Sequence, residues 1–488
     1  YLNTAKWLTE DGSLRVEPTD GAFDSIDNLR FTGAALYVED DGAIEFQFNH
    51  LASVVMAVAD DLGGERLTLR TPAMATAAGL IALYAVAARV LRRPVLSLAA
   101  PLLFAATLPL LNVSRNTYSE PFALLLLWAA ILVLCRMHRR PSVAAGVLGG
   151  VLLGAGLCVR IDSLVYVAMA FPLAALSLAT TPADSQDRRV QLRAWIAAMV
   201  GLLVVGAIGV IDLELRTGFY LDHLADQVSL MRMAFLGSLV VSVAGYVLWS
   251  AVTWLRKVVP PLLRTLAPVA AVAVAVVLFA AWFVRPEVQT ARGPIPNTMV
   301  EGIQRAAGDT VDGTRTYAED SMRWMSWYLG APALVAMIAG TALTVARTLR
   351  GTARSAAVVV GALVLGAGGL YLWNPSITPD QLWATRRYVP AILPAMAVMA
   401  VVSLAWIDTA LGSLLDRRRH GAVGSTPTDR RIRVAVLALL LAALVVPAAA
   451  TTWPLRSALA QAGHLQMVLE ACDIVGEDAA IIVLGGPA

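Results

Sequence analysis

The sequence predicts an all-α protein that crosses a membrane many times. Of its 488 residues, 58% are hydrophobic and 15% are charged, whereas soluble globular proteins carry roughly a quarter charged residues. The apolar residues form runs of about 20, the length that a helix needs to cross a hydrocarbon core of roughly 30 Å. The composition excludes a soluble enzyme, a disordered chain and a secreted disulfide scaffold, and no motif points to nucleic-acid recognition.

Twelve apolar segments are expected to span the membrane. In one of them Gly146, Gly150 and Gly154 recur every four residues, which predicts close packing against another helix. The segments lie near residues 70–89, 94–112, 120–135, 142–159, 163–180, 195–213, 234–255, 265–284, 330–346, 355–374, 390–408 and 434–452.

Three units follow from these spans. Residues 1–69 form a first loop with helices along the membrane surface, 70–452 form the transmembrane bundle, and 453–488 begin a further domain. The chain starts at Tyr1, and 478–488 read as a strand leading into a Gly-Gly turn. We therefore expect the sequence to be a fragment that lacks a first span and the rest of a C-terminal α/β domain.

Charge divides the connecting loops into two alternating sets. One set holds 21 Arg and Lys against five acids, and the rest of the chain holds 17 basic against 30 acidic residues. Because cytoplasmic loops are enriched in Arg and Lys, the basic set is predicted to be cytoplasmic. The large loops, 1–69, 214–233, 285–329, 375–389 and the tail, then face outward. The protein is expected in the plasma membrane with its active side extracytoplasmic.

The first outer segment is the most acidic part of the chain. Most of its carboxylates suit a solvated loop, and one of them could serve as a general base that activates an acceptor hydroxyl. Residues 46–62 predict a helix along the membrane surface. His50, at its start, suits a hydrogen bond at the helix end, with catalysis as the alternative.

The second outer loop places polar residues between two spans. Ser119 or Glu120 can cap the following helix, with Pro121 in its first turn. Capping accounts for Ser119 and Pro121, whereas Arg115 and Glu120, at the membrane edge between two apolar spans, favour a functional interpretation. An arginine at the membrane edge is well suited to a lipid phosphate.

Two further outer turns carry arginine. Arg160 and Asp162 flank Ile161 in a very short turn, either as a local ion pair or with Arg160 as a phosphate ligand. The loop before the eleventh span contains Arg386, Arg387 and Tyr388. Adjacent arginines on the outer side run against the positive-inside trend, which indicates an anionic ligand there.

These segments together resemble the GT-C superfamily of membrane glycosyltransferases, in particular the branch of protein O-mannosyltransferases and aminoarabinose transferases in its actinobacterial form. The resemblance extends from residue 1 to about 455. It rests on YLNTAKWLTEDGSL, FQFNHLASVV, SRNTYSEPFALLLL, VRIDSL, WMSWYLGAPAL and WATRRYVPAILPAM.

The resemblance implies a bundle of about thirteen helices and an inverting transfer of a sugar from a polyprenyl-phosphate donor to a glycan or protein acceptor. Mannose and arabinose are both compatible. The matching phosphate-binding positions are Arg115, Arg160, Arg386 and Arg387, and Glu120 matches an acidic position. The family's main acidic pair would precede Tyr1, so Asp24 and Asp27 are the candidate bases within this chain. Supporting roles are expected for His50, Asp162 and Tyr388.

No metal site is predicted, although some members of the superfamily use a divalent cation. The alternatives are a lipid-linked sugar flippase or transporter, and a non-catalytic membrane scaffold. Ion-coupled transporters usually keep ionisable groups at mid-membrane depth. Here every charge within the spans lies near a span end, which favours chemistry at the membrane surface.

Overall fold

The computed structural model describes residues 1–16, 36–38, 43–181, 186–417, 427–458 and 463–475. Its α-helices are α1 (Leu2–Asp11), α2 (Leu51–Leu91), α3 (Pro94–Ser97), α4 (Ala99–Ala105), α5 (Leu108–Arg115), α6 (Glu120–Arg139), α7 (Val143–Val159), α8 (Ser163–Ala168), α9 (Ala170–Thr180), α10 (Gln186–Arg216), α11 (Gly218–His223), α12 (Ala225–Ala251), α13 (Thr253–Phe283), α14 (Arg285–Val288), α15 (Thr298–Ala307), α16 (Ser321–Leu329), α17 (Ala331–Leu349), α18 (Ser355–Ala362), α19 (Gly368–Trp373), α20 (Gln381–Ala384), α21 (Ile392–Arg417), α22 (Pro427–Thr452) and α23 (His464–Val475).

Short helical turns and one small sheet complete the described elements. The turns are η1 (Ala318–Asp320), η2 (Leu363–Ala367), η3 (Thr385–Arg387) and η4 (Trp453–Leu455). Strands β1 (Arg15–Val16), β2 (Leu36–Val38) and β3 (Ile44–Phe46) form an antiparallel sheet in the order β1-β3-β2, with Arg15 opposite Glu45 and Leu36 opposite Phe46.

Long apolar helices dominate the described part of the chain, as the sequence predicts. Ten are long and apolar enough to cross a membrane. An eleventh would be the pair formed by Pro94–Ala105 and Leu108–Arg115, which is bent by 70°. Helix α7 is apolar but has 17 residues. The fold is therefore that of an all-α, multi-pass membrane protein.

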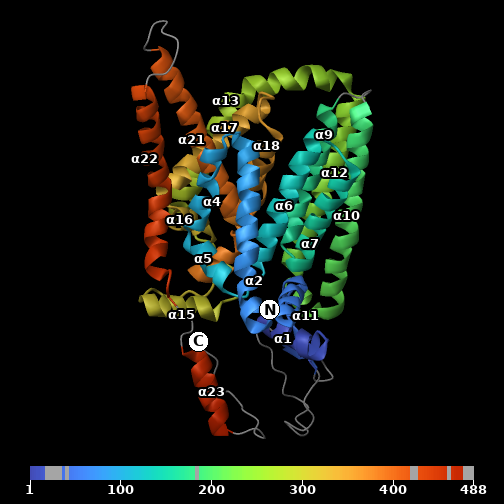
Figure 1. Ribbon diagram of the computed structural model, residues 1–488, viewed down its shortest axis with the longest axis vertical. Coiled ribbons are helices and arrows are strands. Elements are labelled where there is room, and N and C mark those ends of the chain that lie inside the picture. Colours follow the sequence, from blue (N-terminus) through green and yellow to red (C-terminus); the bar gives the residue numbers. More distant parts are fainter. Residues whose placement is uncertain (17–35, 39–42, 182–185, 418–426, 459–462, 476–488) are drawn as a thin grey trace.

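Most of the long helices stand side by side along the long axis of the molecule (Figure 1). The end of the bundle that carries α1, α11 and α15 is called the lower end. The upper end is the opposite one, where α2 meets α3 and α17 meets α18. Helices α1, α11 and α15 belong to three of the predicted outer segments, and they lie together at the lower end (Figure 1).

Helix α2 contains both the predicted surface helix and the first span. It begins at Leu51, five residues later than predicted, because Ile44–Phe46 pair as β3. Gly63 and Gly64 break the helix, and Gly64 adopts φ 65°, a conformation that a residue with a Cβ rarely adopts. The residues before this break pack with α1 against α6 and the end of α7. The N-terminal segment thus covers the start of α6.

Helix α7 lies unusually close to α10, and the predicted glycine stripe is the reason. A Cβ on Gly146 would overlap the carbonyl oxygen of Ala194, and a Cβ on Gly150 would overlap that of Ala198. This confirms the prediction that small residues permit close helix packing there. Because α7 ends at Val159, the same contact positions the turn that follows it.

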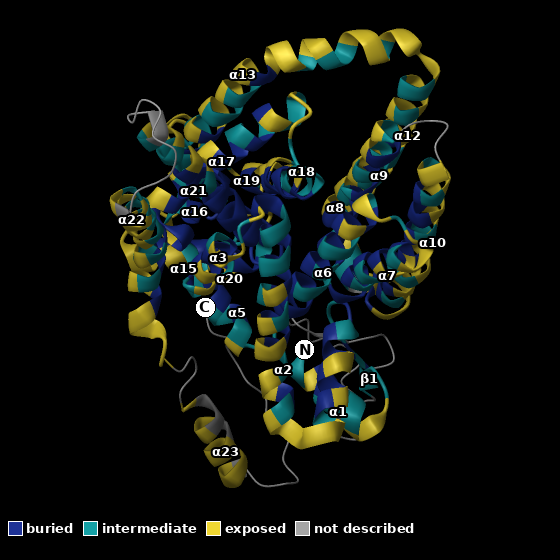
Figure 2. Ribbon diagram, turned by 45° about the horizontal axis from the view of Figure 1, so that its top comes forward, coloured by how far each residue is buried: buried dark blue, intermediate teal, exposed yellow. Residues whose placement is uncertain are grey.

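The deepest part of the core surrounds the first half of α21. Residues 391–402 are almost entirely buried, and α21 contacts α17, α4 and α22. Figure 2 shows buried residues gathered around α17 and α21, with exposed ones on α10, α12 and α13. The indole nitrogen of Trp128, on α6, donates to the carbonyl oxygen of Pro390 at 3.0 Å. The residues just before α21 are therefore fixed against α6.

Candidate functional site

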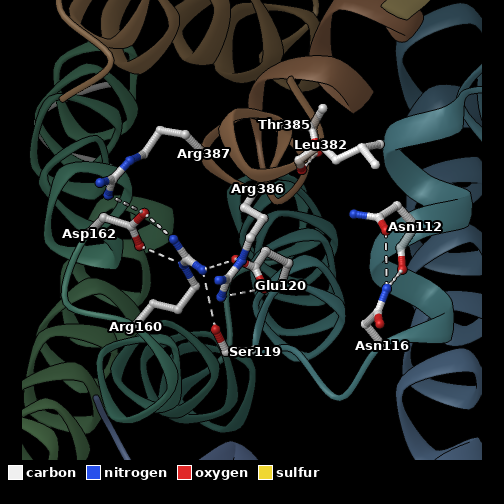
Figure 3. A network of polar contacts seen from close by, with 10 residues as sticks. All are labelled: Asn112, Asn116, Ser119, Glu120, Arg160, Asp162, Leu382, Thr385, Arg386 and Arg387. Carbon is white, nitrogen blue, oxygen red and sulfur yellow. Dashed lines mark hydrogen bonds and ion pairs between the residues drawn. The ribbon is translucent and has the colours of Figure 1, made fainter. Parts of the chain in front are cut away.

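Three segments that are far apart in the sequence meet at the lower end of the bundle. Ser119 and Glu120 lie at the start of α6, and Arg160 and Asp162 lie in the turn between α7 and α8. The third segment is η3, which carries Arg386 and Arg387. Figure 3 shows the side chains of these residues pointing toward one another. We call the five residues Glu120, Arg160, Asp162, Arg386 and Arg387 the arginine–carboxylate network.

Glu120 is the buried centre of one half of this network. Its side chain is fully inaccessible and forms ion pairs with Arg160 and Arg386. The Nε of Arg386 donates to Oε1 at 2.6 Å, and its second terminal nitrogen lies 3.4 Å from Oε2. Arg160 also donates to the hydroxyl of Ser119 at 3.2 Å. Ser119 occupies the N-cap position of α6, but its side chain forms no capping hydrogen bond.

Asp162 is the centre of the other half. Arg160 binds it through two parallel hydrogen bonds, from Nε to Oδ1 at 2.9 Å and from a terminal nitrogen to Oδ2 at 2.8 Å. Arg387 approaches Oδ2 at 3.3 Å. Burial alone would raise the pKa of the Asp162 carboxyl, but the charges and hydrogen bonds of Arg160 and Arg387 lower it to about 2. The carboxyl is therefore ionised at neutral pH.

The network carries one positive charge in excess, because three arginines face two carboxylates. The side chains of Arg386, Arg160 and Arg387 are 8%, 12% and 23% exposed. Arg387 also donates to the carbonyl oxygen of Ser376 at 3.2 Å, while its Nε is buried without a hydrogen-bond partner among the described residues. A buried donor without a partner is costly, and an anion bound at the network would offset its excess positive charge.

Aromatic side chains hold the arginines in place. The guanidinium of Arg386 lies 4.2 Å from the centre of the Tyr118 ring and 4.2 Å from that of the Trp383 ring, and these two rings are nearly perpendicular to each other. The phenol of Tyr1 lies close enough to the network for its charges to shift the pKa of that group. Burial and the charge of Glu120 raise the pKa of the Tyr1 phenol to about 12, although Arg160 and Arg386 oppose the shift. Contact with two aromatic rings restricts the movement of the Arg386 guanidinium, which suits recognition of a phosphate.

A mainly apolar groove of about 410 Å³ adjoins the network. Its walls come from α7, α8, α10 and α12, and they include Leu157, Ile161, Leu164, Leu213 and Phe235. Ile161 stands between Arg160 and Asp162 in the sequence, so the same turn contributes to the groove and to the network. One end of the groove is polar, where Glu214 and Arg232 form an ion pair at 2.8 Å.

The structure brings five of the predicted site residues together and separates three others. Arg115 is exposed and donates to the carbonyl oxygen of Arg456, so it does not join the network. His50 is buried, and its Nδ1 lies 2.9 Å from Oδ1 of Asp212 on α10. Tyr388 is buried, and its hydroxyl has no hydrogen-bond partner among the described residues. Burial raises the pKa of that phenol.

The candidate bases Asp24 and Asp27 lie outside the described residues. Within the part of the chain that the structure does describe, no three His, Cys, Asp or Glu side chains come close enough together to hold a metal ion.

Sequence reasoning missed several members of the site. In the sequence, Tyr118 and Trp383 are near neighbours of Arg115 and Arg386. Their contact with the guanidinium of Arg386 depends on how the helices pack and could not be predicted from the sequence. The local pair of Arg160 with Asp162 was one of two interpretations of that turn. The structure confirms the local pair and shows that Arg160 also reaches Glu120, whereas the role of Arg160 as a phosphate ligand stays a prediction.

No family model and no curated protein matches this chain.

Proposed function

We propose that this chain is a GT-C-type membrane glycosyltransferase that moves a sugar of the mannose or arabinose class from a polyprenyl phosphate to a glycan or protein acceptor. One observation carries the proposal. A buried network with one excess positive charge and an apolar groove share the turn 160–162. Together they suit a molecule that joins a phosphate to a long hydrocarbon chain.

The reaction would break the bond between the anomeric carbon and the phosphate oxygen. The electron pair of that bond goes to the phosphate, the acceptor oxygen bonds to the anomeric carbon, and the acceptor proton goes to a base. The phosphate changes from a singly charged diester to a monoester with additional negative charge. Fixed arginines stabilise charge that develops in this way, so no nucleotide is needed at the site. The Nε–H of Arg387 is a donor that no described residue uses.

Glu120 suits a positioning role better than that of the base. Both of its oxygens accept from arginines, and its side chain is fully buried. A base needs a free oxygen within reach of the acceptor hydroxyl. Within this chain the base is therefore assigned to the first outer segment, where Asp24 and Asp27 are the candidates.

The membrane arrangement is part of the proposal. Twelve spans result if α7 and the bent pair of α3–α4 with α5 each cross the membrane. The positive-inside rule then places the lower end, with the network, on the extracytoplasmic side of the plasma membrane. The described part of the tail that follows α22 would lie on the same side.

The test is transfer of labelled sugar by the chain in membranes. Polyprenyl-phosphate mannose and polyprenyl-phosphate arabinose are supplied separately, and release of sugar from the lipid is followed with and without acceptor glycan. Arg387→Gln should lower release at least about tenfold, the cost of losing one charged hydrogen bond. The matched control is Arg305→Gln, an exposed arginine of α15 paired with Glu301.

Three outcomes contradict the proposal. Release that is equal in the wild type and in Arg387→Gln would remove the phosphate-binding role of the network. Movement of intact donor across the bilayer without release would indicate a lipid-linked sugar transporter. Absence of both activities, in a folded sample that binds neither donor, would indicate a scaffold.

A further inference from the structure

A polar cavity, separate from the apolar groove, lies at the upper end of the bundle, on the far side of the membrane from the network. It has a volume of about 310 Å³ and is bounded by the end of α2, the junction between α17 and α18, and α21. Three of its lining residues are arginines, Arg93, Arg347 and Arg354. In Figure 1 this region lies where α17 and α18 are labelled, well away from α11.

The charge of this cavity is poorly neutralised. Arg93 shares the carboxylate of Asp408 with Arg433, so one acid serves two arginines. Among the described residues, Arg347 and Arg354 have no ion-pair partner. Arg354 donates to the carbonyl oxygen of Val90 at 2.5 Å and to no carboxylate.

Arg354 also experiences repulsion from its neighbours. Burial and the charges of Arg92, Arg139, Arg347 and Arg93 lower the pKa of its guanidinium. These four neighbours are all arginines. An anion that enters such a cluster of positive charges stabilises it.

The backbone adds donors to the same cavity. Helix α18 begins there, after Arg354, and no side chain caps the free N–H groups of its first turn. Uncapped N–H groups at the start of a helix favour a negative charge. Ala357, from this first turn, lines the cavity.

The wall formed by α21 is mainly apolar, with the hydroxyl of Thr409 as its polar group. It includes Val402, Ala405 and Trp406, and the side chain of Trp406 is 46% exposed. Tryptophan is enriched where a protein meets lipid headgroups, and basic pockets between transmembrane helices on the cytoplasmic side bind anionic headgroups. Arginine on one wall and an exposed indole on the other fit a phosphate that is attached to a glycerol and its acyl chains.

We propose that this cavity binds the phosphate group of an anionic phospholipid in the leaflet at the upper end. Arg347 and Arg354 hold the phosphate oxygens, and Trp406 contacts the glycerol and the first part of the acyl chains. The site is separate from the proposed donor site and does not depend on the transferase activity.

The test uses the purified chain in a neutral detergent. Binding of short-chain phosphatidylglycerol, phosphatidylcholine and inorganic phosphate is measured by native mass spectrometry and by the shift in Tm. We expect phosphatidylglycerol to bind and raise Tm, and the other two ligands to have little effect. Arg347→Gln should weaken this binding about tenfold, and the further change Arg354→Gln should abolish it.

Arg347→Gln keeps the test valid if Arg354→Gln fails to fold, since the Arg347 side chain is exposed and makes no hydrogen bond among the described residues. The matched control is Arg350→Gln, an exposed arginine of the same junction that does not line the cavity. Equal binding by the wild type and Arg347→Gln would overturn the proposal. An equal loss of phosphatidylglycerol binding in Arg350→Gln would also overturn it, because binding would then depend on the overall positive charge of the surface. Inorganic phosphate that binds as tightly as the lipid would overturn it as well.

Discussion

Replacing Glu120 with Gln separates the stability of the network from its ability to bind an anion. The substitution keeps the size of the side chain and removes its charge. Arg160 and Arg386 both lose their ion pair with a side chain that is fully buried. Breaking a buried ion pair by removing one partner costs about 3–5 kcal/mol. The net charge of the network meanwhile rises from one positive charge to two.

The variant should therefore lose stability without losing affinity for the anion. In thermal unfolding of the detergent-purified chain, Glu120→Gln should lower stability by about 3 kcal/mol or more. Its affinity for polyprenyl phosphate should be equal to or higher than that of the wild type, provided that binding is measured well below the unfolding temperature. The matched control is Glu301→Gln, which removes an i,i+4 pair on α15 and should cost under about 0.5 kcal/mol.

The reasoning is refuted if Glu120→Gln unfolds at the wild-type temperature, because the carboxylate would then not hold the two arginines. It is also refuted if affinity for polyprenyl phosphate is lost while the protein remains folded, because Glu120 would then act on the ligand itself.

Three further predictions follow from the same geometry. Arg115→Gln should leave affinity for polyprenyl phosphate within about twofold of the wild type, measured by equilibrium binding, because Arg115 lies outside the network; a tenfold loss would restore its predicted phosphate-binding role. The pKa of Asp162 is lower in the folded protein, about 2, than its ordinary value, so its contribution to stability is complete above about pH 4 and is lost as pH falls toward 2. The Tm should therefore show no change due to Asp162 between pH 5 and 8. Below pH 4, the Tm of Asp162→Asn should fall less steeply than that of the wild type. The same fall of Tm with pH in both proteins would contradict the low pKa of Asp162. Gly150→Ala places a methyl group against the backbone of α10 and should lower stability by about 1–3 kcal/mol, whereas Gly237→Ala, with open space around it, should be near neutral; equal Tm values for the two variants would show that α7 and α10 are not packed closely.

The sequence was sufficient for the features that depend on local patterns. Runs of about 20 apolar residues predicted the helices, and the glycine stripe of α7 predicted a close contact. The start of α2 was less predictable. The segment 44–46 carries apolar residues on both sides of Glu45, and its pairing with Arg15–Val16 and Leu36–Val38 decides that it forms a strand.

The site was predicted as a set of residue types rather than as an arrangement. Arg160 and Asp162 are two positions apart, so their pair could be considered from the sequence. Glu120 and Arg386 are 266 positions apart, and His50 and Asp212 are 162 apart. Nothing local specifies such partners, because they are set by how the helices pack. The same reason explains why Arg115, next to the correct loop, faces Arg456 instead of the network.

The most direct test of the central claim compares two ligands that differ only in the phosphate. Equilibrium binding of polyprenyl phosphate and of the corresponding polyprenol would be measured for the purified chain and for Arg387→Gln. The account predicts that the wild type binds the phosphate at least about tenfold more tightly than the alcohol, and that Arg387→Gln largely removes this preference while still binding the alcohol in the apolar groove. Equal affinity of the wild type for the two ligands would contradict the account.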